Sequence, residues 1–226
     1  DVYKRQILTL EDPIEFLFRN KKSIVNQREI GNDASDLTVA LKNALRQAPD
    51  CILIGEIRDK ETMSAALAYA QSGHLVVATL HANNSYQALT RVINFYPIEN
   101  RQSLLADLSS SLRAIVSQRL VSAIDGKRRA AVEVMLNTRH IAELIEQGEI
   151  ALIKEAIEKS LSPGSQTFEQ ALMQLIKDGV VTQDEALAHA DSASNLFWLL
   201  NNSAQAVEEE APEQEEASFT EFTLKM

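Results

Sequence analysis

The stretch Cys51-Ile-Leu-Ile-Gly-Glu-Ile-Arg-Asp59 decides the fold, because a short apolar run passes directly into a glycine and a charged turn. We expect the apolar run to be a fully buried strand that places Glu56 at its carboxyl end, where open α/β sheets bind their ligands. A carboxylate at that edge accepts a proton from water or orients the water for attack on a terminal phosphate. Taken alone, the stretch fits a strand that runs into an ordinary charged turn equally well.

The sequence around this stretch alternates short apolar segments with amphipathic ones. Asp36 is a helix-capping residue type, and Leu37, Leu41 and Leu45 follow it at four-residue spacing, which is typical of one helix face. Pro49 ends that helix, and a second helix is expected over residues 60–71. The other expected strands are 7–10, 23–29 and 75–79. This order predicts an α/β fold with a mainly parallel sheet and helices on both of its faces.

The pattern becomes helical after residue 98. Leu104, Leu108, Leu112 and Ile115 recur at three- and four-residue steps, which predicts one long apolar helix face. Asp125-Gly126 lies between two apolar segments and predicts a β-hairpin. The hairpin strands are expected over residues 120–124 and 130–136, and short helices over about 138–147, 150–160, 167–178 and 182–190.

These patterns divide the chain into three parts. Residues 7–136 form the α/β core, residues 137–202 a helical carboxyl-terminal subdomain, and residues 203–226 an acidic disordered tail. The tail holds seven glutamates and one lysine, which contribute −6 of the net charge of −10. The acidity therefore belongs to the tail, and the sequence argues against a nucleic-acid partner.

The cysteine content and the lengths of the apolar runs indicate the cellular compartment that we expect. Cys51 is the only cysteine, which excludes a disulfide and a cysteine-based zinc site and fits a reducing cytoplasm. No apolar run approaches the roughly 20 residues of a membrane-spanning helix, so we expect a soluble protein without a transmembrane segment.

A second acidic group follows the first expected strand. Glu11, Asp12 and Glu15 surround Pro13, which fixes a turn. In a parallel sheet this turn lies at the same edge as Glu56, where carboxylates from two strands hold magnesium directly or through water. Taken alone, the group fits an ordinary polar loop better.

Two histidines bracket the expected strand 75–79. Seven extended residues span about 23 Å, so His74 and His81 do not bind one metal ion together. His74 lies at the strand entry, where a structural or interface role fits. His81 lies at the exit, where a neutral imidazole donates a hydrogen bond to a phosphate oxygen. Arg46 and Arg91 are solvated surface charges or, at a subunit boundary, neutralise charge on a neighbour's nucleotide.

The 226 residues do not contain the phosphate-binding motif G-x-x-x-x-G-K-[ST], and the seven glycines are scattered. The chain also starts without methionine. We therefore interpret it as an amino-terminally truncated fragment, with the phosphate-gripping half of a nucleotide site missing.

Three blocks carry a resemblance to a known family. They are the acidic box Ile7-Leu-Thr-Leu-Glu-Asp-Pro-Ile-Glu-Phe16, the segment Leu45-Arg-Gln-Ala-Pro-Asp-Cys-Ile-Leu-Ile-Gly-Glu-Ile-Arg-Asp59 and the histidine box Gly73-His-Leu-Val-Val-Ala-Thr-Leu-His81. In this order and spacing, the chain resembles the type IV pilus retraction ATPases (the PilT/PilU family) over about residues 7–202. The second block is similar to their Walker B motif, which has glycine where most related ATPases have aspartate.

The resemblance implies a RecA-like P-loop ATPase core and a hexameric, magnesium-dependent motor that hydrolyses ATP. It implies that Glu56 is the catalytic glutamate, with Glu15 and His81 beside it, and that Glu15 and Glu56 hold Mg²⁺, directly or through water. The further nucleotide-binding residues that it implies are Glu11, Asp12, Arg46, Arg58, His74 and Arg91.

The resemblance also suggests a branch of the family. Assembly and type II secretion motors carry a four-cysteine zinc module, which one cysteine rules out. Segment 140–147 has Ala142 and Glu146 where the main retraction motor has arginines. Segments 80–84, 167–172 and 190–196 instead look like the accessory paralogue.

The expected function is thus part of a hexameric ATPase that drives or assists pilus retraction in twitching motility. Its expected place is the cytoplasmic side of the inner membrane, at the base of the pilus machine. The expected partners are further copies or the paralogous retraction ATPase, and the inner-membrane platform protein. The alternatives are a non-catalytic assembly module of the same machine and a RecA-like ATPase outside pilus biology.

Overall fold

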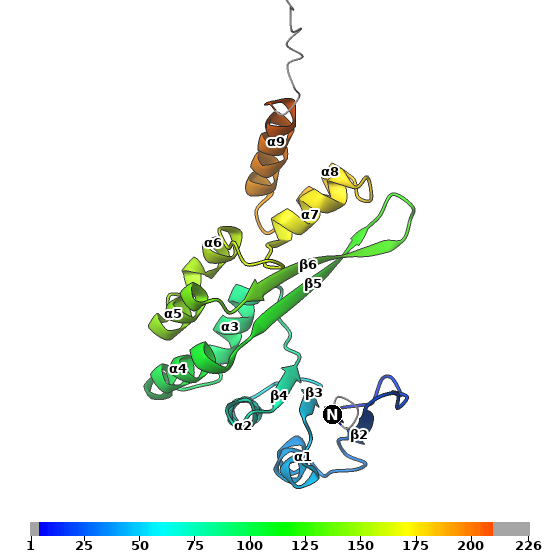
Figure 1. Cartoon of the computed structure of the whole chain (residues 1–226), viewed down its shortest axis with the longest axis vertical. Helices are drawn as coiled ribbons and strands as arrows, with labels where there is room; N and C mark the ends of the chain where they lie inside the picture. Colours follow the sequence, from blue (N-terminus) through cyan, green and yellow to red (C-terminus); the bar gives the residue numbers. More distant parts are fainter. Residues whose placement is uncertain (1–4, 210–226) are drawn as a thin grey trace, which may run out of the picture. The chain divides into compact units, whose positions relative to one another are not determined.

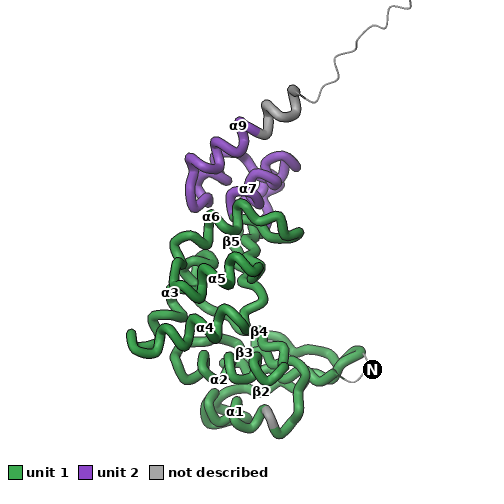
Figure 2. The backbone as a smooth tube through the Cα atoms, turned by 60° about the vertical axis from the view of Figure 1, so that its left-hand side comes forward, with its two compact units in different colours: residues 1–120, 130–167 green, residues 121–129, 168–226 purple. Residues whose placement is uncertain are grey.

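The computed structural model of the chain describes the backbone of residues 5–209 and the side chains of residues 5–44 and 46–202 (Figure 1). The chain forms two compact units, coloured separately in Figure 2. Unit 1 contains residues up to 120 and residues 130–167, and unit 2 contains residues 121–129 and the chain from residue 168. These limits differ from the boundary expected at residue 136, so the three-part division stays a prediction.

Unit 1 begins with a four-stranded sheet in the order β2-β1-β3-β4. All neighbouring strands are parallel, which confirms the predicted fold class. The register aligns Leu8 with Ile52 and Ile52 with Val76. The strands are β1 (Gln6–Glu11), β2 (Ile24–Glu29), β3 (Cys51–Ile54) and β4 (Leu75–Ala78).

Two helices cover one face of this sheet, α1 (Leu37–Ala44) and α2 (Lys60–Gln71). The carboxylate of Asp36 accepts a hydrogen bond from the backbone N–H of Val39 and caps α1, as predicted. A short 3₁₀ helix, η1 (Leu45–Gln47), follows α1 and ends before Pro49.

The prediction of helices on both faces is wrong for the part of the chain that the structure describes. Ile52 and Ile54 face the helices and are completely buried, whereas Cys51 and Leu53 point to the other face and are only half-buried. On the same open face, Leu75 is 57% exposed and Val77 is 43% exposed. The apolar run of β3 is therefore buried on one side only, because successive strand residues alternate between the faces.

The remainder of unit 1 is built from short helices and most of a hairpin, whose turn (residues 121–129) belongs to unit 2. The hairpin is confirmed, but Ile115 lies in its first strand and not on the predicted helix face. The helix ends at Ser111, and Leu112 adopts an extended conformation from which the β-branched Ile115 and Val116 continue as a strand. The elements are α3 (Ser85–Asn94), η2 (Ile98–Asn100), α4 (Arg101–Ser111), β5 (Ala114–Ser122), β6 (Arg128–Leu136), α5 (Arg139–Gln147), η3 (Ile150–Leu152) and α6 (Ile153–Glu158).

Unit 2 contains α7 (Phe168–Lys177), α8 (Gln183–His189) and α9 (Ala193–Glu209). Its core includes the fully buried Phe168, Leu172 and Leu196. Helix α9 continues to Glu209, into residues that the sequence assigned to the tail, while residues 210–226 of that tail lie outside the described residues. Within residues 5–209, no helix combines the length and apolar character that a membrane crossing requires.

Candidate functional site

The carboxyl ends of β1, β3 and β4 surround a cavity of about 580 Å³ in unit 1. The parallel sheet brings the polar residues that follow these three strands to one edge, as the sequence predicted. The ionisable residues that line the cavity include Glu11, Asp12, Glu15, Glu56, Arg58 and His81.

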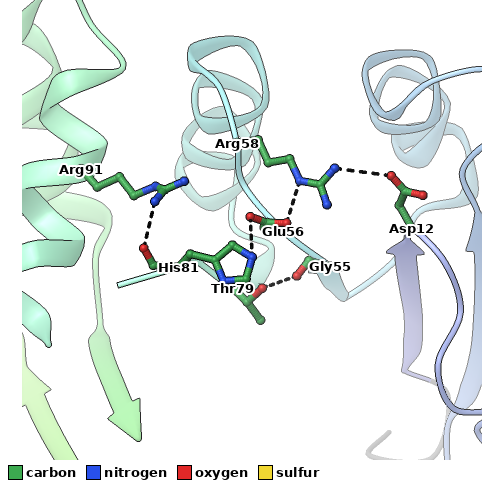
Figure 3. A network of polar contacts seen from close by, with 7 residues as sticks. All are labelled: Asp12, Gly55, Glu56, Arg58, Thr79, His81 and Arg91. Carbon is green, nitrogen blue, oxygen red and sulfur yellow. Dashed lines mark hydrogen bonds and ion pairs between the residues drawn. The ribbon is translucent and has the colours of Figure 1, made fainter. Parts of the chain in front are cut away.

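Glu56 is the best-connected residue of the site (Figure 3). Its side chain is 16% exposed, and each of its two oxygens has a partner. Oε2 accepts a hydrogen bond of 2.6 Å from Nε of Arg58, and Oε1 lies 3.1 Å from Nε2 of His81. Each oxygen of Glu56 is therefore paired with a nitrogen of a basic side chain, Arg58 on one side and His81 on the other.

The charges around Glu56 favour its ionised form. The hydrogen bond from Arg58 lowers the pKa of Glu56 below its ordinary value, against the opposing effect of burial, and the nearby charges of Arg58, His81 and Arg91 add to the lowering. The same contact raises the pKa of Arg58. Glu56 is thus a carboxylate at neutral pH and carries no proton of its own.

Arg58 also connects two strand ends. Its Nη1 lies 3.6 Å from Oδ2 of Asp12, which follows β1, while its Nε binds Glu56 after β3 (Figure 3). Glu11 next to Asp12 accepts hydrogen bonds from the hydroxyl of Thr9 (2.6 Å) and the side-chain amide of Gln27 (2.9 Å). The acidic turn is therefore anchored to the sheet, and Arg58 ties it to Glu56.

Gly55 lets the ends of β1 and β3 approach each other. Its N–H donates a hydrogen bond of 2.8 Å to the carbonyl of Leu10, and its carbonyl accepts one from the hydroxyl of Thr79 (Figure 3). A Cβ atom at position 55 would lie 3.0 Å from the Leu10 oxygen and 3.3 Å from Cα of Glu11. Any larger residue would push the two strand ends apart and change the position of Glu56.

His81 is positioned by helix α3. The guanidinium of Arg91 in α3 donates a hydrogen bond of 3.1 Å to the carbonyl of His81 (Figure 3). Helix α3 itself begins at Ser85, after Asn84 caps it by accepting a hydrogen bond from the N–H of Gln87. Arg91 therefore acts on the backbone beside Glu56, and its charge adds to the field that keeps Glu56 ionised.

Three of the predicted site residues, His74, Arg46 and Arg91, do not line the cavity. His74 precedes β4 at the end opposite His81, where its Nδ1 lies 3.0 Å from the hydroxyl of Ser72 and its ring packs edge-on against Tyr69. Arg46 is exposed in η1 and is not among the cavity-lining residues. Their predicted nucleotide-binding roles stay predictions, as do those of the residues inside the cavity.

The described residues do not form a complete magnesium site. Carboxylate oxygens are the ligands that Mg²⁺ prefers, and Glu15 lines the same cavity as Glu56. However, both oxygens of Glu56 are engaged by Arg58 and His81. Within residues 5–209, no three His, Cys, Asp or Glu side chains are grouped so that they would hold a metal ion. Magnesium binding by Glu15 and Glu56 therefore stays a prediction.

Gly55 and Thr79 also shape the site, although the sequence did not identify them as site residues. Both residues directly follow a strand, and each joins the backbone of one strand end to the next. The available signal was their position, because a small residue between a buried strand and a charged turn often marks a close backbone approach.

Comparison with known proteins agrees with the resemblance seen in the sequence. Residues 1–133 match the family described as Type II/IV secretion system protein. The type IV pilus ATPase PilU of Pseudomonas aeruginosa is 52% identical over 195 residues, which cover 86% of this chain and 51% of the relative. The type IV pilus retraction ATPase PilT of the same organism is 41% identical over 190 residues, which cover 84% of this chain and 55% of the relative.

A solved structure gives the same result for the fold. The crystal structure of the pilus retraction motor PilT with bound ADP matches with a TM-score of 0.78 and 37% sequence identity, covering 85% of this chain and 55% of that chain. The chain thus spans about half the length of the relatives that it matches.

Proposed function

The chain belongs to the type II/IV secretion system protein family, and from this membership we propose that it is part of an ATPase of type IV pilus retraction. The accessory branch is supported by the higher identity to PilU, 52%, than to PilT, 41%. Glu56 carries the proposal, because it lies at the carboxyl edge of a parallel sheet, in the same cavity as the acidic turn and His81.

We assign the cavity to the terminal phosphate of ATP. The relative PilT binds ADP in its crystal structure, which supports a nucleotide as the ligand. The glycine-rich loop that would hold the other phosphates is not part of the 226-residue sequence. A bound magnesium ion would supply charge neutralisation of the phosphates.

The ionised Glu56 accepts a proton from the water that attacks the phosphate. Arg58 and His81 each engage one carboxylate oxygen, and opening either contact would give water fuller access to Glu56. His81 would then donate its Nε2 hydrogen to a phosphate oxygen, and the guanidinium of Arg58 would face the developing negative charge. Glu56 returns the proton to solvent after hydrolysis.

The assembly follows from the same family membership. We propose a homo-hexamer, or a mixed assembly with the paralogous retraction ATPase, at the cytoplasmic base of the pilus machine against its inner-membrane platform protein. The relatives PilU and PilT, both described as type IV pilus ATPases, support this placement.

The test of this function is the substitution Glu56→Gln in the native protein. The amide keeps the size of the side chain but does not accept the proton, so ATP hydrolysis should fall by about 10²–10⁴-fold while nucleotide binding persists. Glu99→Gln in η2, an exposed glutamate outside the cavity, is the matched control. Unchanged hydrolysis in Glu56→Gln would remove the role assigned to this residue.

The closed arrangement of Glu56 also favours a second candidate, a non-catalytic assembly module. Titration of the 226-residue chain with ATP separates the two functions. Micromolar binding contradicts the module, whereas a native protein that assembles with its paralogue but neither binds nor hydrolyses ATP contradicts the ATPase.

A further inference from the structure

The loop between β1 and β2 carries three neighbouring large apolar side chains that point into solvent. Phe16 is 79% exposed, Leu17 82% and Phe18 54%, and we call these three residues the apolar tip. Figure 1 shows this loop as a blue segment that projects from the sheet. Exposed large apolar residues that occur together mark an interaction surface more often than single ones do.

The apolar tip is held in place by one side chain of β2. The amide of Gln27 accepts a hydrogen bond of 2.8 Å from the N–H of Phe18 and donates one of 2.8 Å to the carbonyl of Phe16. The same amide donates to Glu11 at the end of β1, at 2.9 Å. Asn20 further along the loop accepts a hydrogen bond from the N–H of Val25. The tip is thus already ordered, so its binding to a partner surface costs little conformational entropy.

The segment that follows the tip is basic. Residues 16–28 contain Arg19, Lys21, Lys22 and Arg28, all exposed, and no acidic residue. The rest of the chain outside residues 203–226 carries a charge of −8, so this segment is opposite in sign to it. An anionic surface would attract this loop and repel most of the remaining chain.

We propose that this loop docks onto an anionic lipid surface. The apolar tip enters the headgroup region, where aromatic side chains are favoured, and Arg19 and Lys21 face the lipid phosphates. A protein partner would need a preformed pocket for three adjacent large side chains, whereas a headgroup layer opens around a protruding tip. This docking goes beyond the proposed ATPase function and does not depend on the nucleotide site.

Co-sedimentation of the 226-residue chain with vesicles tests the charge contribution. We expect binding to vesicles of equal parts phosphatidylcholine and phosphatidylglycerol, weaker binding at high salt, and none to phosphatidylcholine alone. The double substitution Arg19→Gln and Lys21→Gln should weaken binding about 30-fold, since each basic residue near an anionic membrane contributes about fivefold. Lys127→Gln with Arg128→Gln removes the same charge from another exposed segment and should leave binding within about twofold of the wild type.

A fluorescent reporter tests the insertion of the tip. Trp198 is the only tryptophan, so Trp198→Phe combined with Phe18→Trp places a single reporter in the loop. Its emission should shift to shorter wavelength with the anionic vesicles and stay unchanged with phosphatidylcholine alone. Phe16→Ser with Phe18→Ser should abolish vesicle binding, whereas Leu161→Ser, at a side chain that is 99% exposed elsewhere, should not.

Three outcomes would overturn the proposal: no binding of the wild-type chain to anionic vesicles, equal losses in the loop variants and their controls, or a reporter emission that does not change. A loop that contacts a second copy of the chain would show itself differently. The Phe16→Ser and Phe18→Ser double variant would then have a smaller hydrodynamic mass without any vesicles, and the wild type would not bind lipid.

Discussion

At the residue scale, the site depends on the two-residue spacing between Glu56 and Arg58. Because Ile57 between them is buried, both charged side chains turn toward the same edge of the sheet, and Arg58 reaches Glu56 and Asp12 together. A positively charged group in this position keeps Glu56 ionised and at the same time keeps it occupied. The local sequence therefore places the proposed base, Glu56, two residues before the arginine that holds it in position.

Arg58→Gln should raise the pKa of Glu56 toward its ordinary value. The hydrogen bond from Arg58 is the largest cause of the lowering, and a neutral amide replaces only part of it. Carbon-13 NMR titration of the glutamate carboxyl groups measures the change. Arg139→Gln, which removes an arginine that pairs with Glu143 instead, is the control. An identical Glu56 titration in the wild type and in Arg58→Gln would contradict the assigned cause.

Gly55→Ala tests the close approach of the two strand ends. The added methyl group would lie 3.0 Å from the carbonyl oxygen of Leu10, which is backbone and has little room to move. We expect the free energy of unfolding to fall by about 1–3 kcal/mol, as for other overpacked positions. Urea denaturation measures it. Gly126→Asn is the control, because that position has open space around it and a positive φ that asparagine tolerates. A fully stable Gly55→Ala variant would show that the strand ends separate without cost.

At the scale of secondary-structure elements, helix α2 fixes the path of the segment that follows β3 and carries Glu56 and Arg58. Asp59 directly follows Arg58 and caps α2, because its carboxylate accepts a hydrogen bond of 2.7 Å from the N–H of Thr62. Helix α3 is fixed in a similar way, since the buried Glu133 of β6 accepts hydrogen bonds of 2.7 Å from both the N–H and the hydroxyl of Ser85. The two helix starts hold the segments that carry Glu56 and His81.

Asp59→Ala should destabilise the protein by about 0.5–2 kcal/mol, because the cap of α2 is lost. Thermal and urea unfolding report the loss, and Asp59→Asn, which keeps an acceptor for the Thr62 N–H, should recover most of it. The alanine variant should also weaken the Glu56–Arg58 contact, visible as a changed Arg58 side-chain NMR signal. Equal stability of the alanine and asparagine variants would contradict the capping role.

At the scale of the whole molecule, each compact unit has its own core and its own polar connections. In unit 2, Glu185 of α8 accepts a hydrogen bond of 2.8 Å from the N–H of Ser122, and Glu169 of α7 accepts one of 2.8 Å from the N–H of Ser192. In unit 1, Glu56 has the corresponding role at the sheet edge. Acidic side chains thus serve as acceptors in both units.

The stability of the chain should therefore fall at acidic pH. The Ser122 backbone N–H lowers the pKa of Glu185, and Arg58 lowers that of Glu56. When folding lowers the pKa of a carboxylate, that carboxylate stabilises the protein at every pH above its ordinary pKa, about 4.3 for glutamate. This stabilisation is lost as the pH falls through the lowered pKa of the folded state. Urea unfolding between pH 7 and about pH 3 measures the loss.

The variant Glu185→Gln measures how much Glu185 contributes to this loss of stability at acidic pH. It should show a smaller decrease of stability with falling pH than the wild type, whereas Glu99→Gln should follow the wild type. If Glu185→Gln has the pH profile of the wild type, the Ser122 contact contributes nothing to acid stability.

The sequence by itself determined the α/β class, the parallel strands, the place of Glu56 at a strand end and the family. These follow from local signals, since an apolar run, a capping aspartate and a charged turn are read from neighbouring residues. It did not predict the open face of β3 and β4, the strand at Ile115 or the extension of α9 to Glu209. Burial on a second face and the pairing of Ile115 depend on residues far away in the chain.

Only the tertiary structure decided which side chains meet. Arg58 reaches Asp12 because β1 and β3 are neighbours in register, and Gln27 holds the apolar tip because β2 pairs with β1. These contacts join residues that are distant in sequence, and their distances are set by strand register and packing, which no local pattern encodes.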